Sequence, residues 1–251
     1  MFVQIEITTI CNFRCFYCAG RDMPAQSMSL ALFDAILLGL PKGRHTISLQ
    51  GEGEPLAHRR FWDMLDRVRS AGHLPYLITN GSLRTTPRLA KYVPMIGISI
   101  DTLERHEADR IGRIRLDRVL ANFERLLADA GPDRLVVHTV DYGQDRTALD
   151  AYLDRHRVTR RVVQPLQTKT DYRHRYPEVV ISAPMPANPA PCNYLLQPRM
   201  VYFNIDGLRM PCCFIKDASR YESETKLLAK FASGKVPVAC DGCREVRSES
   251  P

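Results

Sequence analysis

Residues 3–18 read VQIEITTICNFRCFYC, a β-type run followed at once by three cysteines. The β-branched residues of positions 3–9 predict a first strand. Cys11, Cys15 and Cys18 then follow at spacings of four and three, so one tight loop carries all three thiols. A structural zinc site normally has four ligands, whereas three thiolates on a cube of four irons leave one iron open to an external ligand. The loop therefore predicts an iron–sulfur site with an open position.

The rest of the first two thirds of the chain alternates between strand and helix patterns. Further β-type runs occupy residues 46–50, 76–80, 96–100, 135–141 and 161–165. Between them, apolar residues recur at helical spacing, as Phe61, Met64, Leu65 and Val68 do. Strands that alternate with helices predict an α/β fold with a parallel sheet, either open or curled toward a barrel. Ligands of such sheets gather at the carboxyl ends of the strands.

The composition is that of an ordinary globular protein, with 251 residues of which 45% are hydrophobic and 25% charged. No apolar run is long enough to span a bilayer and the N-terminus lacks a signal peptide, so we expect a cytoplasmic protein without a membrane partner. In a reducing compartment, eight cysteines favour metal ligands or catalytic thiols over disulfides. The net charge of +7 is spread among acidic residues, which favours a solvated surface over a nucleic-acid partner.

Two motifs carry a resemblance to a known family. The spacing Cys-x3-Cys-x-aromatic-Cys, with Tyr17 in the aromatic position, resembles the cluster motif of radical S-adenosylmethionine enzymes. Gly51-Glu52-Gly53-Glu54-Pro55 resembles the Gly-Gly-Glu-Pro motif that receives the methionine amino group of the cofactor, although Glu52 stands in a glycine position. The resemblance covers about residues 1–167. It implies a partial (β/α)6 barrel, bound S-adenosylmethionine and one 4Fe-4S cluster on Cys11, Cys15 and Cys18.

The same resemblance extends to the ends of the next two predicted strands. Thr79 and Asn80 end the third β-type run, and Ser99 and Asp101 end the fourth. In related enzymes, polar side chains at these places contact the carboxylate and the ribose of the cofactor. The implied cofactor contacts are Tyr17, Glu52, Gly53, Glu54, Thr79, Asn80, Ser99 and Asp101.

A second set of cysteines lies near the C-terminus. Asp206-Gly207 predicts a hairpin turn between residues 200–205 and 208–210, which would bring Cys192 close to Cys212. Cys240 and Cys243 complete four ligands. The spacing after Gly207 favours Cys212 over the adjacent Cys213, and an exchange of roles between these two stays open. Such a layout is compatible with a zinc ribbon. Behind a radical S-adenosylmethionine domain it resembles the Twitch form of the SPASM extension, which implies a second, auxiliary 4Fe-4S cluster. With no cysteine beyond Cys243, we expect only one such site.

These observations predict three parts. They are the radical S-adenosylmethionine barrel over residues 1–167, a proline-rich surface linker over residues 168–191, and a Twitch-like auxiliary-cluster domain over residues 192–251. An auxiliary cluster favours a reaction in which an electron leaves or enters the substrate. The plan resembles that of the 2-deoxy-scyllo-inosamine dehydrogenases, which implies an oxidoreductase acting on a sugar-like or aminocyclitol-like small molecule in natural-product biosynthesis, by dehydrogenation or epimerisation. A flavodoxin-type or ferredoxin-type protein would supply electrons.

Two alternatives remain open at this stage. One is a maturase that modifies a ribosomally made peptide or a protein side chain; the chain begins directly on its first predicted strand, which speaks against a domain for a leader peptide. The other is a zinc-stabilised binding module without radical chemistry. The catalytic residue is unassigned. His138 is a candidate proton acceptor, with a buried hydrogen-bonded histidine as the alternative interpretation.

Other side chains could reach a substrate from the predicted strand ends. Gln164, Gln167 and Lys169 follow the sixth β-type run, with ordinary surface loop residues as the equally plausible interpretation. Arg113 and Arg118 could contact a carboxylate, but arginine is too abundant in this chain for that to single them out.

Overall fold

The computed structural model describes residues 1–83, 87–169, 185–197 and 200–248. Within these residues one eight-stranded sheet has the order β6-β5-β4-β3-β2-β1-β8-β9, and β7 pairs with β10 in a small second sheet. The strands are β1 (Phe2–Ile5), β2 (Thr46–Leu49), β3 (Leu74–Thr79), β4 (Met95–Ser99), β5 (Leu135–Asp141), β6 (Arg161–Pro165), β7 (Pro189–Ala190), β8 (Met200–Phe203), β9 (Arg209–Met210) and β10 (Arg247–Ser248).

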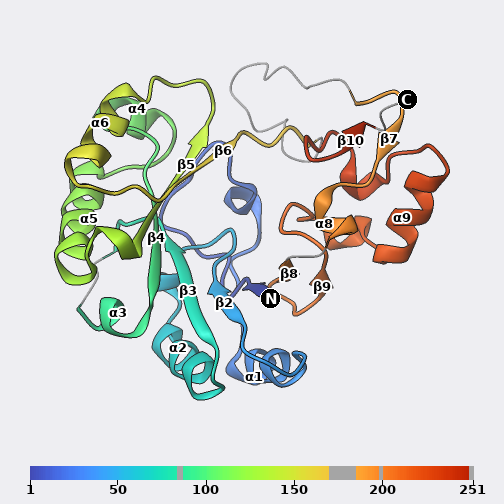
Figure 1. Cartoon of the computed structure of the whole chain (residues 1–251), viewed down its shortest axis with the longest axis horizontal. Coiled ribbons are helices and arrows are strands. Elements are labelled where there is room, and N and C mark those ends of the chain that lie inside the picture. Colours follow the sequence, from blue (N-terminus) through green and yellow to red (C-terminus); the bar gives the residue numbers. More distant parts are fainter. Residues whose placement is uncertain (84–86, 170–184, 198–199, 249–251) are drawn as a thin grey trace.

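Helices connect the first six strands. They are α1 (Leu30–Leu38), α2 (Phe61–Ser70), α3 (Pro87–Tyr92), α4 (Arg105–Arg110), α5 (Leu116–Ala130) and α6 (Thr147–Arg155), followed in the C-terminal part by α8 (Asn193–Leu196) and α9 (Glu224–Ala232). Figure 1 shows α4, α5 and α6 on the outer side of the sheet and the C-terminal part, in red, on its other side. The sheet therefore has helices along one face and the chain's tail across the other.

The six strands β1 to β6 run parallel in chain order, as the alternation of strands and helices predicts. The bounds of β5 and β6 are those expected from the sequence, whereas β1 ends at Ile5 instead of residue 9. The reason is that the chain leaves the sheet after Glu6, and Thr8 forms an isolated antiparallel bridge with Ser27. A parallel order brings the carboxyl ends of all six strands to one edge.

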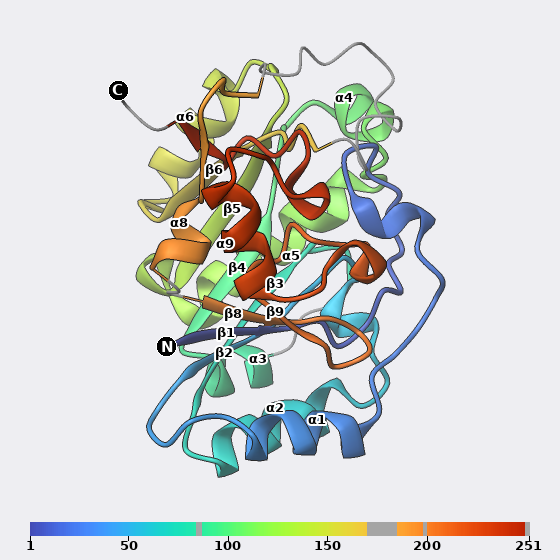
Figure 2. The same ribbon diagram turned by 90° about the vertical axis from the view of Figure 1, so that its right-hand side faces the viewer.

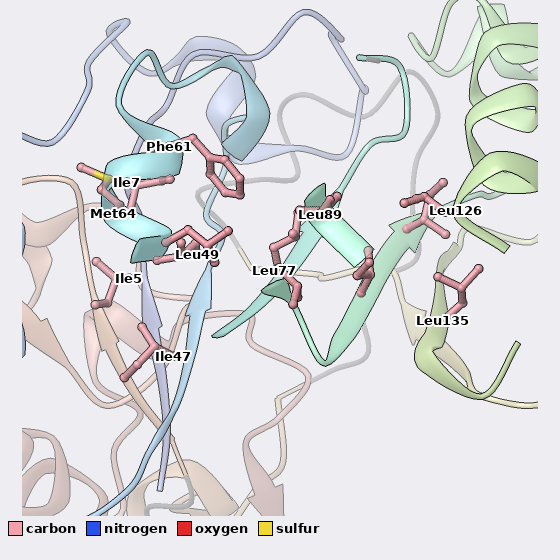
Figure 3. Packing of buried hydrophobic residues seen from close by; sticks show 14 of the residues in the cluster. Ile5, Ile7, Ile47, Leu49, Phe61, Met64, Leu77, Leu89, Leu126 and Leu135 are labelled. Carbon is pink, nitrogen blue, oxygen red and sulfur yellow. The ribbon is translucent and has the colours of Figure 1, made fainter. Parts of the chain in front are cut away.

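The main hydrophobic core lies between the sheet and its helices. Phe61, Met64, Leu65 and Val68 of α2 are buried, so the helical stripe predicted from the sequence is the packed face. Figure 3 shows Phe61 and Met64 of α2 with Ile5, Ile47 and Leu49 of the first two strands. This core fixes the strand ends that carry the polar residues described below.

The C-terminal part joins the same sheet. The predicted hairpin forms: β8 and β9 pair antiparallel around Gly207, whose φ is +79°. In addition β8 pairs parallel with β1, with Phe2 opposite Met200, and Figures 1 and 2 show these strands side by side. A second, smaller apolar cluster holds Tyr202, Met210, Ile215 and Leu227 together. The tail is thus anchored by strand pairing and packing, which the sequence alone does not indicate.

The linker expected over residues 168–191 can be followed only in part. Residues 170–184 lie outside the described residues, and Thr168 and Lys169 are buried instead of lying on the surface. Among the described helices, none is long and apolar enough to cross a bilayer.

Candidate radical site and second thiol set

The three N-terminal cysteines lie on a loop that is held from both sides. Backbone hydrogen bonds join it to the segment after α4: the amide of Arg14 donates to Gly112 O at 3.1 Å, and that of Phe16 donates to Ile111 O at 3.1 Å. Gly112 has a φ of +88°, and a Cβ there would lie 2.2 Å from the carbonyl oxygen of Arg14. Only glycine allows the two segments to approach this closely.

A buried ion pair supports the same loop from below. Arg113 Nε lies 2.7 Å from Asp101 Oδ2, and Arg113 also donates to the Tyr17 hydroxyl at 2.8 Å. Tyr17 in turn donates a short hydrogen bond to Asp101. Burial opposes the charge on Arg113, but Asp101, Tyr17 and Cys15 together outweigh burial and raise the pKa of the guanidinium well above its ordinary value. Tyr17, Asp101 and Arg113 therefore form one tightly bonded group.

The loop of residues 51–55 lies directly against the cysteine loop. The amide of Gly53 donates to Thr8 O at 3.2 Å, and the amide of Glu54 donates to Ile10 O at 2.9 Å. A Cβ at Gly53 would lie 2.4 Å from Thr8 O, so the glycine is required by the close approach of the two backbones.

The carboxylate of Glu54 joins the ends of β2 and β3. It accepts hydrogen bonds from the Thr79 hydroxyl at 2.7 Å, the Asn80 amide at 2.6 Å and the Leu56 amide at 3.1 Å. Burial raises the pKa of Glu54 against the effect of these donors. Asn80 extends the contact, because its side-chain nitrogen lies 3.6 Å from Cys11 Sγ.

Glu52 connects the cysteine loop to the C-terminal part. Its carboxylate accepts from the Gly20 amide at 3.0 Å and from the Cys18 thiol at 3.1 Å, and forms an ion pair with Lys216 at 2.5 Å. Burial alone would raise the pKa of Glu52, but Lys216 and the other donors outweigh it and lower that pKa. Lys216 carries no motif in the sequence, so its place at this site was missed.

These elements enclose a cavity of about 300 Å³ at the carboxyl edge of the sheet. All three N-terminal cysteines line it, together with seven of the eight cofactor contacts that the resemblance implies: Tyr17, Glu52, Gly53, Glu54, Thr79, Asn80 and Ser99. Asp101 is the exception, because its carboxylate faces Tyr17 and Arg113 behind the cavity wall. The far wall comes from β5, β6 and the C-terminal part, including His138, Gln164 and Cys213.

His138 lines the cavity from β5. Its Nε2 lies 2.8 Å from the Tyr76 hydroxyl, and burial lowers its pKa from 6.5 to about 4. The imidazole is therefore neutral at physiological pH, as a proton acceptor must be. Its ring is also held by a hydrogen bond, as expected of a buried structural histidine. Of the other candidates, Arg113 is bound to Asp101 and Arg118 is exposed outside the cavity.

Four of the C-terminal cysteines gather around a second, small cavity. Cys192, Cys212 and the pair Cys240 and Cys243 line it from three different stretches of the tail. The adjacent Cys213 faces the other way, into the large cavity. In residues 1–83, 87–169, 185–197 and 200–248, no three His, Cys, Asp or Glu side chains are placed to hold a single metal ion, and this is true of both cysteine sets.

The sequence of the first two thirds of the chain identifies its family. Residues 5–160 match the model of the radical SAM superfamily, where SAM stands for S-adenosylmethionine. The chain belongs to the radical SAM superfamily. Members of this superfamily bind S-adenosylmethionine and a 4Fe-4S cluster, as the resemblance implies. The alternative of a zinc-stabilised binding module without radical chemistry is therefore wrong.

Curated relatives of this radical SAM chain act on nucleotides, according to their names. A GTP 3',8-cyclase of Ectopseudomonas mendocina is 35% identical over 153 residues, which are 55% of this chain and 45% of the relative. An S-adenosylmethionine-dependent nucleotide dehydratase of Selenomonas ruminantium is 27% identical over 132 residues, which are 49% of this chain and 47% of the relative. The chain thus spans about half the length of the curated relatives it matches.

Solved structures share the fold. SuiB of Streptococcus suis bound to S-adenosylmethionine has a TM-score of 0.67 at 14% identity, covering 95% of this chain and 66% of SuiB. BtrN in complex with AdoMet and 2-DOIA has a TM-score of 0.53 at 16% identity, covering 99% of this chain and 93% of BtrN. Likeness at such identities concerns the fold alone.

The expectation of an oxidoreductase for a sugar or aminocyclitol is wrong. Several curated relatives are GTP 3',8-cyclases, among them proteins of Ectopseudomonas mendocina and Chlorobaculum tepidum. The expectation came from the number and spacing of the cysteines. Such a pattern concerns the binding of a metal or cofactor and carries no information on which molecule fills the cavity.

Proposed function

We propose that this chain cleaves S-adenosylmethionine reductively and uses the radical formed to act on a nucleotide. The observation that carries the proposal is the single cavity that holds the Cys11, Cys15 and Cys18 loop opposite the Gly51–Pro55 loop. When bound, the cluster supplies the electron that splits the cofactor into methionine and a 5′-deoxyadenosyl radical. The residues of the chain position the reacting groups and exclude water from them.

The residues that line this cavity fit both a 4Fe-4S cluster and S-adenosylmethionine. Cys11, Cys15 and Cys18 supply three sulfur ligands and leave one iron open, as a chelating cofactor needs. Gly51 and Gly53 let this loop pack against the first strand and the cysteine loop, since a Cβ there would lie 2.3 Å from Glu6 Cγ and 2.4 Å from Thr8 O. Glu54, Thr79, Asn80 and Ser99 offer hydrogen-bonding groups along one wall. We infer that these hold the methionyl and ribose ends, and that Tyr17 lies beside the adenosyl end.

Asp101 has an indirect role in this proposal. Because it faces Arg113 and Tyr17 and not the cavity, it positions Tyr17 and the cysteine loop instead of contacting the cofactor. The wall formed by His138, Gln164 and Cys213 remains for the substrate.

The substrate class rests on the relatives. Both the GTP 3',8-cyclases and the nucleotide dehydratase carry a nucleotide in their names. We infer that the cavity receives a nucleotide, with GTP as the first compound to test. A flavodoxin-type or ferredoxin-type protein is the proposed electron donor.

We also propose that the tail is a Twitch-like domain with an auxiliary 4Fe-4S cluster on Cys192, Cys212, Cys240 and Cys243. Their gathering around one cavity supports this assignment. When bound, such a cluster supplies a site that takes up or releases one electron.

The test is iron content and cofactor cleavage in protein reconstituted without oxygen. We expect about eight irons per chain from two four-iron clusters. Replacing Cys11, Cys15 and Cys18 with Ala should leave about four and abolish release of 5′-deoxyadenosine, because the open iron is lost. Replacing Cys240 and Cys243 should also leave about four, with release of 5′-deoxyadenosine retained.

Cys213→Ala is the matched control, since this thiol adjoins Cys212 but faces the other cavity; its iron content should stay at the wild-type value. Substrate is tested in the same assay by adding GTP, another nucleoside triphosphate, or none. We expect nucleotide to be consumed together with 5′-deoxyadenosine release. Release that persists in the Cys11, Cys15 and Cys18 variant contradicts the radical site, and unchanged nucleotides contradict the substrate class.

A further inference from the structure

Lys169, just after β6, lies buried among the second set of cysteines. Only 1% of its surface is exposed, and its Nζ donates to Phe214 O at 2.9 Å and to Ala239 O at 2.8 Å. Phe214 follows Cys212 by two residues, and Ala239 directly precedes Cys240. The ammonium therefore lies between the two stretches that carry these thiols, and it lines the same small cavity as all four cysteines.

Gln167 lines the large cavity, but its side-chain amide also contacts one of the four thiols. Its side-chain nitrogen lies 3.7 Å from Cys243 Sγ. Its oxygen accepts from the Thr168 amide at 2.9 Å and from the Arg244 amide at 3.3 Å, which fixes the orientation of the side-chain amide and leaves the NH₂ group toward the sulfur. The short segment after β6 thus brings both an N–H donor and a positive charge to the thiol set, although Lys169 and Ala239 are 70 residues apart in the chain.

A buried positive charge acts strongly on the groups around it, because electrostatic interactions are larger inside a protein than in water. Four cysteine thiolates around a cube of irons carry net negative charge, and this charge increases by one when the cluster is reduced. A nearby cation therefore stabilises the reduced form more than the oxidised form. Net charge and hydrogen bonds to sulfur are established determinants of cluster potentials.

We propose that Lys169 is a positioning and charge-balancing residue for the auxiliary cluster, which it holds at a raised reduction potential. The proposal rests on the proposed assignment of that cluster to Cys192, Cys212, Cys240 and Cys243. It gives a role to a lysine that the sequence would otherwise assign to a surface loop or to the substrate.

The experiment measures the midpoint potential of the auxiliary cluster alone. The background protein carries Cys11, Cys15 and Cys18→Ala, so that the electron paramagnetic resonance signal of the reduced protein comes from one cluster. Lys169→Met removes the charge and the hydrogen bonds, Lys169→Gln keeps a donor without the charge, and Lys169→Arg keeps the charge. Lys230→Met, on the exposed face of α9, is the control for loss of one positive charge from the same part of the molecule.

We expect Lys169→Met and Lys169→Gln to make reduction at least tenfold less favourable, a shift of about 59 mV toward negative potential for a one-electron couple. Lys169→Arg and Lys230→Met should stay near the background value. An unshifted potential in both Met and Gln variants overturns the proposal. A shift in the Met variant alone also overturns it, because it would indicate that Lys169 only ties the two stretches together. Loss of the cluster from all three Lys169 variants overturns it as well.

Failure of the cluster assignment gives a different result. If the background protein holds no iron, the auxiliary cluster itself is refuted and the proposal for Lys169 falls with it. If it holds about four irons and the potential does not respond to Lys169, the cluster assignment stands and only the role of Lys169 is refuted.

Discussion

The ion pair of Arg113 and Asp101 lies buried beneath the cysteine loop. Asp101 has no exposed side-chain surface and Arg113 has only 12%, so each charge depends on the other. Removing one partner of such a pair leaves an uncompensated charge in the protein interior. The hydroxyl of Tyr17 is bonded to both, so the effect reaches the aromatic position of the cluster motif directly.

Arg113→Met should therefore lower the free energy of unfolding by about 3–5 kcal/mol. The measurement is chemical denaturation of the wild type and the variant under nitrogen. The control is Arg105→Met, because Arg105 pairs with Asp117 in solvent, where both side chains are more than two thirds exposed. An exposed pair contributes about 0–1 kcal/mol, so equal losses in the two variants would refute the special role of the buried pair.

His138 makes stability depend on pH. Because burial lowers its pKa from 6.5 to about 4, the unfolded chain binds a proton between these values while the folded protein does not. The contribution of neutral His138 to the free energy of unfolding is complete above pH 6.5 and is lost as the pH falls toward 4. The free energy of unfolding changes by at most about 3 kcal/mol over this interval.

His138→Asn should flatten this part of the profile. We expect the difference in unfolding free energy between pH 7 and pH 5 to be smaller in the variant than in the wild type. The same substitution at His106, exposed on α4, should leave the profile of the wild type in place. Parallel profiles for wild type and His138→Asn would argue against a buried neutral imidazole.

At the level of elements, the approach of the α4 end to the cysteine loop depends on Gly112. Gly72, after α2, is a matched glycine: its φ is +78° against +88° for Gly112, but an added Cβ would meet nothing within 4 Å. Alanine at either place incurs left-handed backbone strain of about 1–2 kcal/mol. Only at Gly112 does the new methyl group collide with a backbone oxygen.

We expect Gly112→Ala to lower both the unfolding free energy and the iron bound at the first site, since the cysteine loop must move away. Gly72→Ala should cost the backbone strain alone and retain the iron of the wild type. Thermal unfolding and iron analysis of the two variants test this directly. Equal iron content in both would show that the loop does not need this contact.

Across the whole molecule, the two parts are joined by a series of buried polar contacts. The Tyr202 hydroxyl of β8 donates to Glu6 at 2.9 Å, and Glu6 accepts from the Glu52 amide at 2.8 Å. Glu52 then pairs with Lys216 of the tail. Together with the pairing of β8 and β1, these contacts make the tail a structural part of the radical site.

Tyr202→Phe should destabilise the protein by about 1.5–3 kcal/mol, because a hydrogen bond to a buried carboxylate is lost. Amide hydrogen exchange in Met200–Phe203 should become faster, since the bond holds β8 against the first strand. Tyr152→Phe is the comparison, as its hydroxyl contacts Glu124 in an exposed position at 3.2 Å. A loss of stability no larger than that of Tyr152→Phe would show that this contact does not couple the parts.

Local patterns of the chain were sufficient for much of the architecture. The bounds of β5 and β6, the buried stripe of α2, the turn at Gly207 and the grouping of three cysteines after β1 all follow from periodicity and spacing within a few residues. Such features depend on interactions between near neighbours in the chain.

Other features could not be read from the residues in order. The parallel pairing of β8 with β1, the ion pair of Glu52 with Lys216 and the burial of Lys169 among the C-terminal cysteines join positions far apart in sequence. No repeat or spacing marks such partners. They are chosen when packing brings distant segments together, because a buried charge or strand edge must then find whichever partner lies beside it.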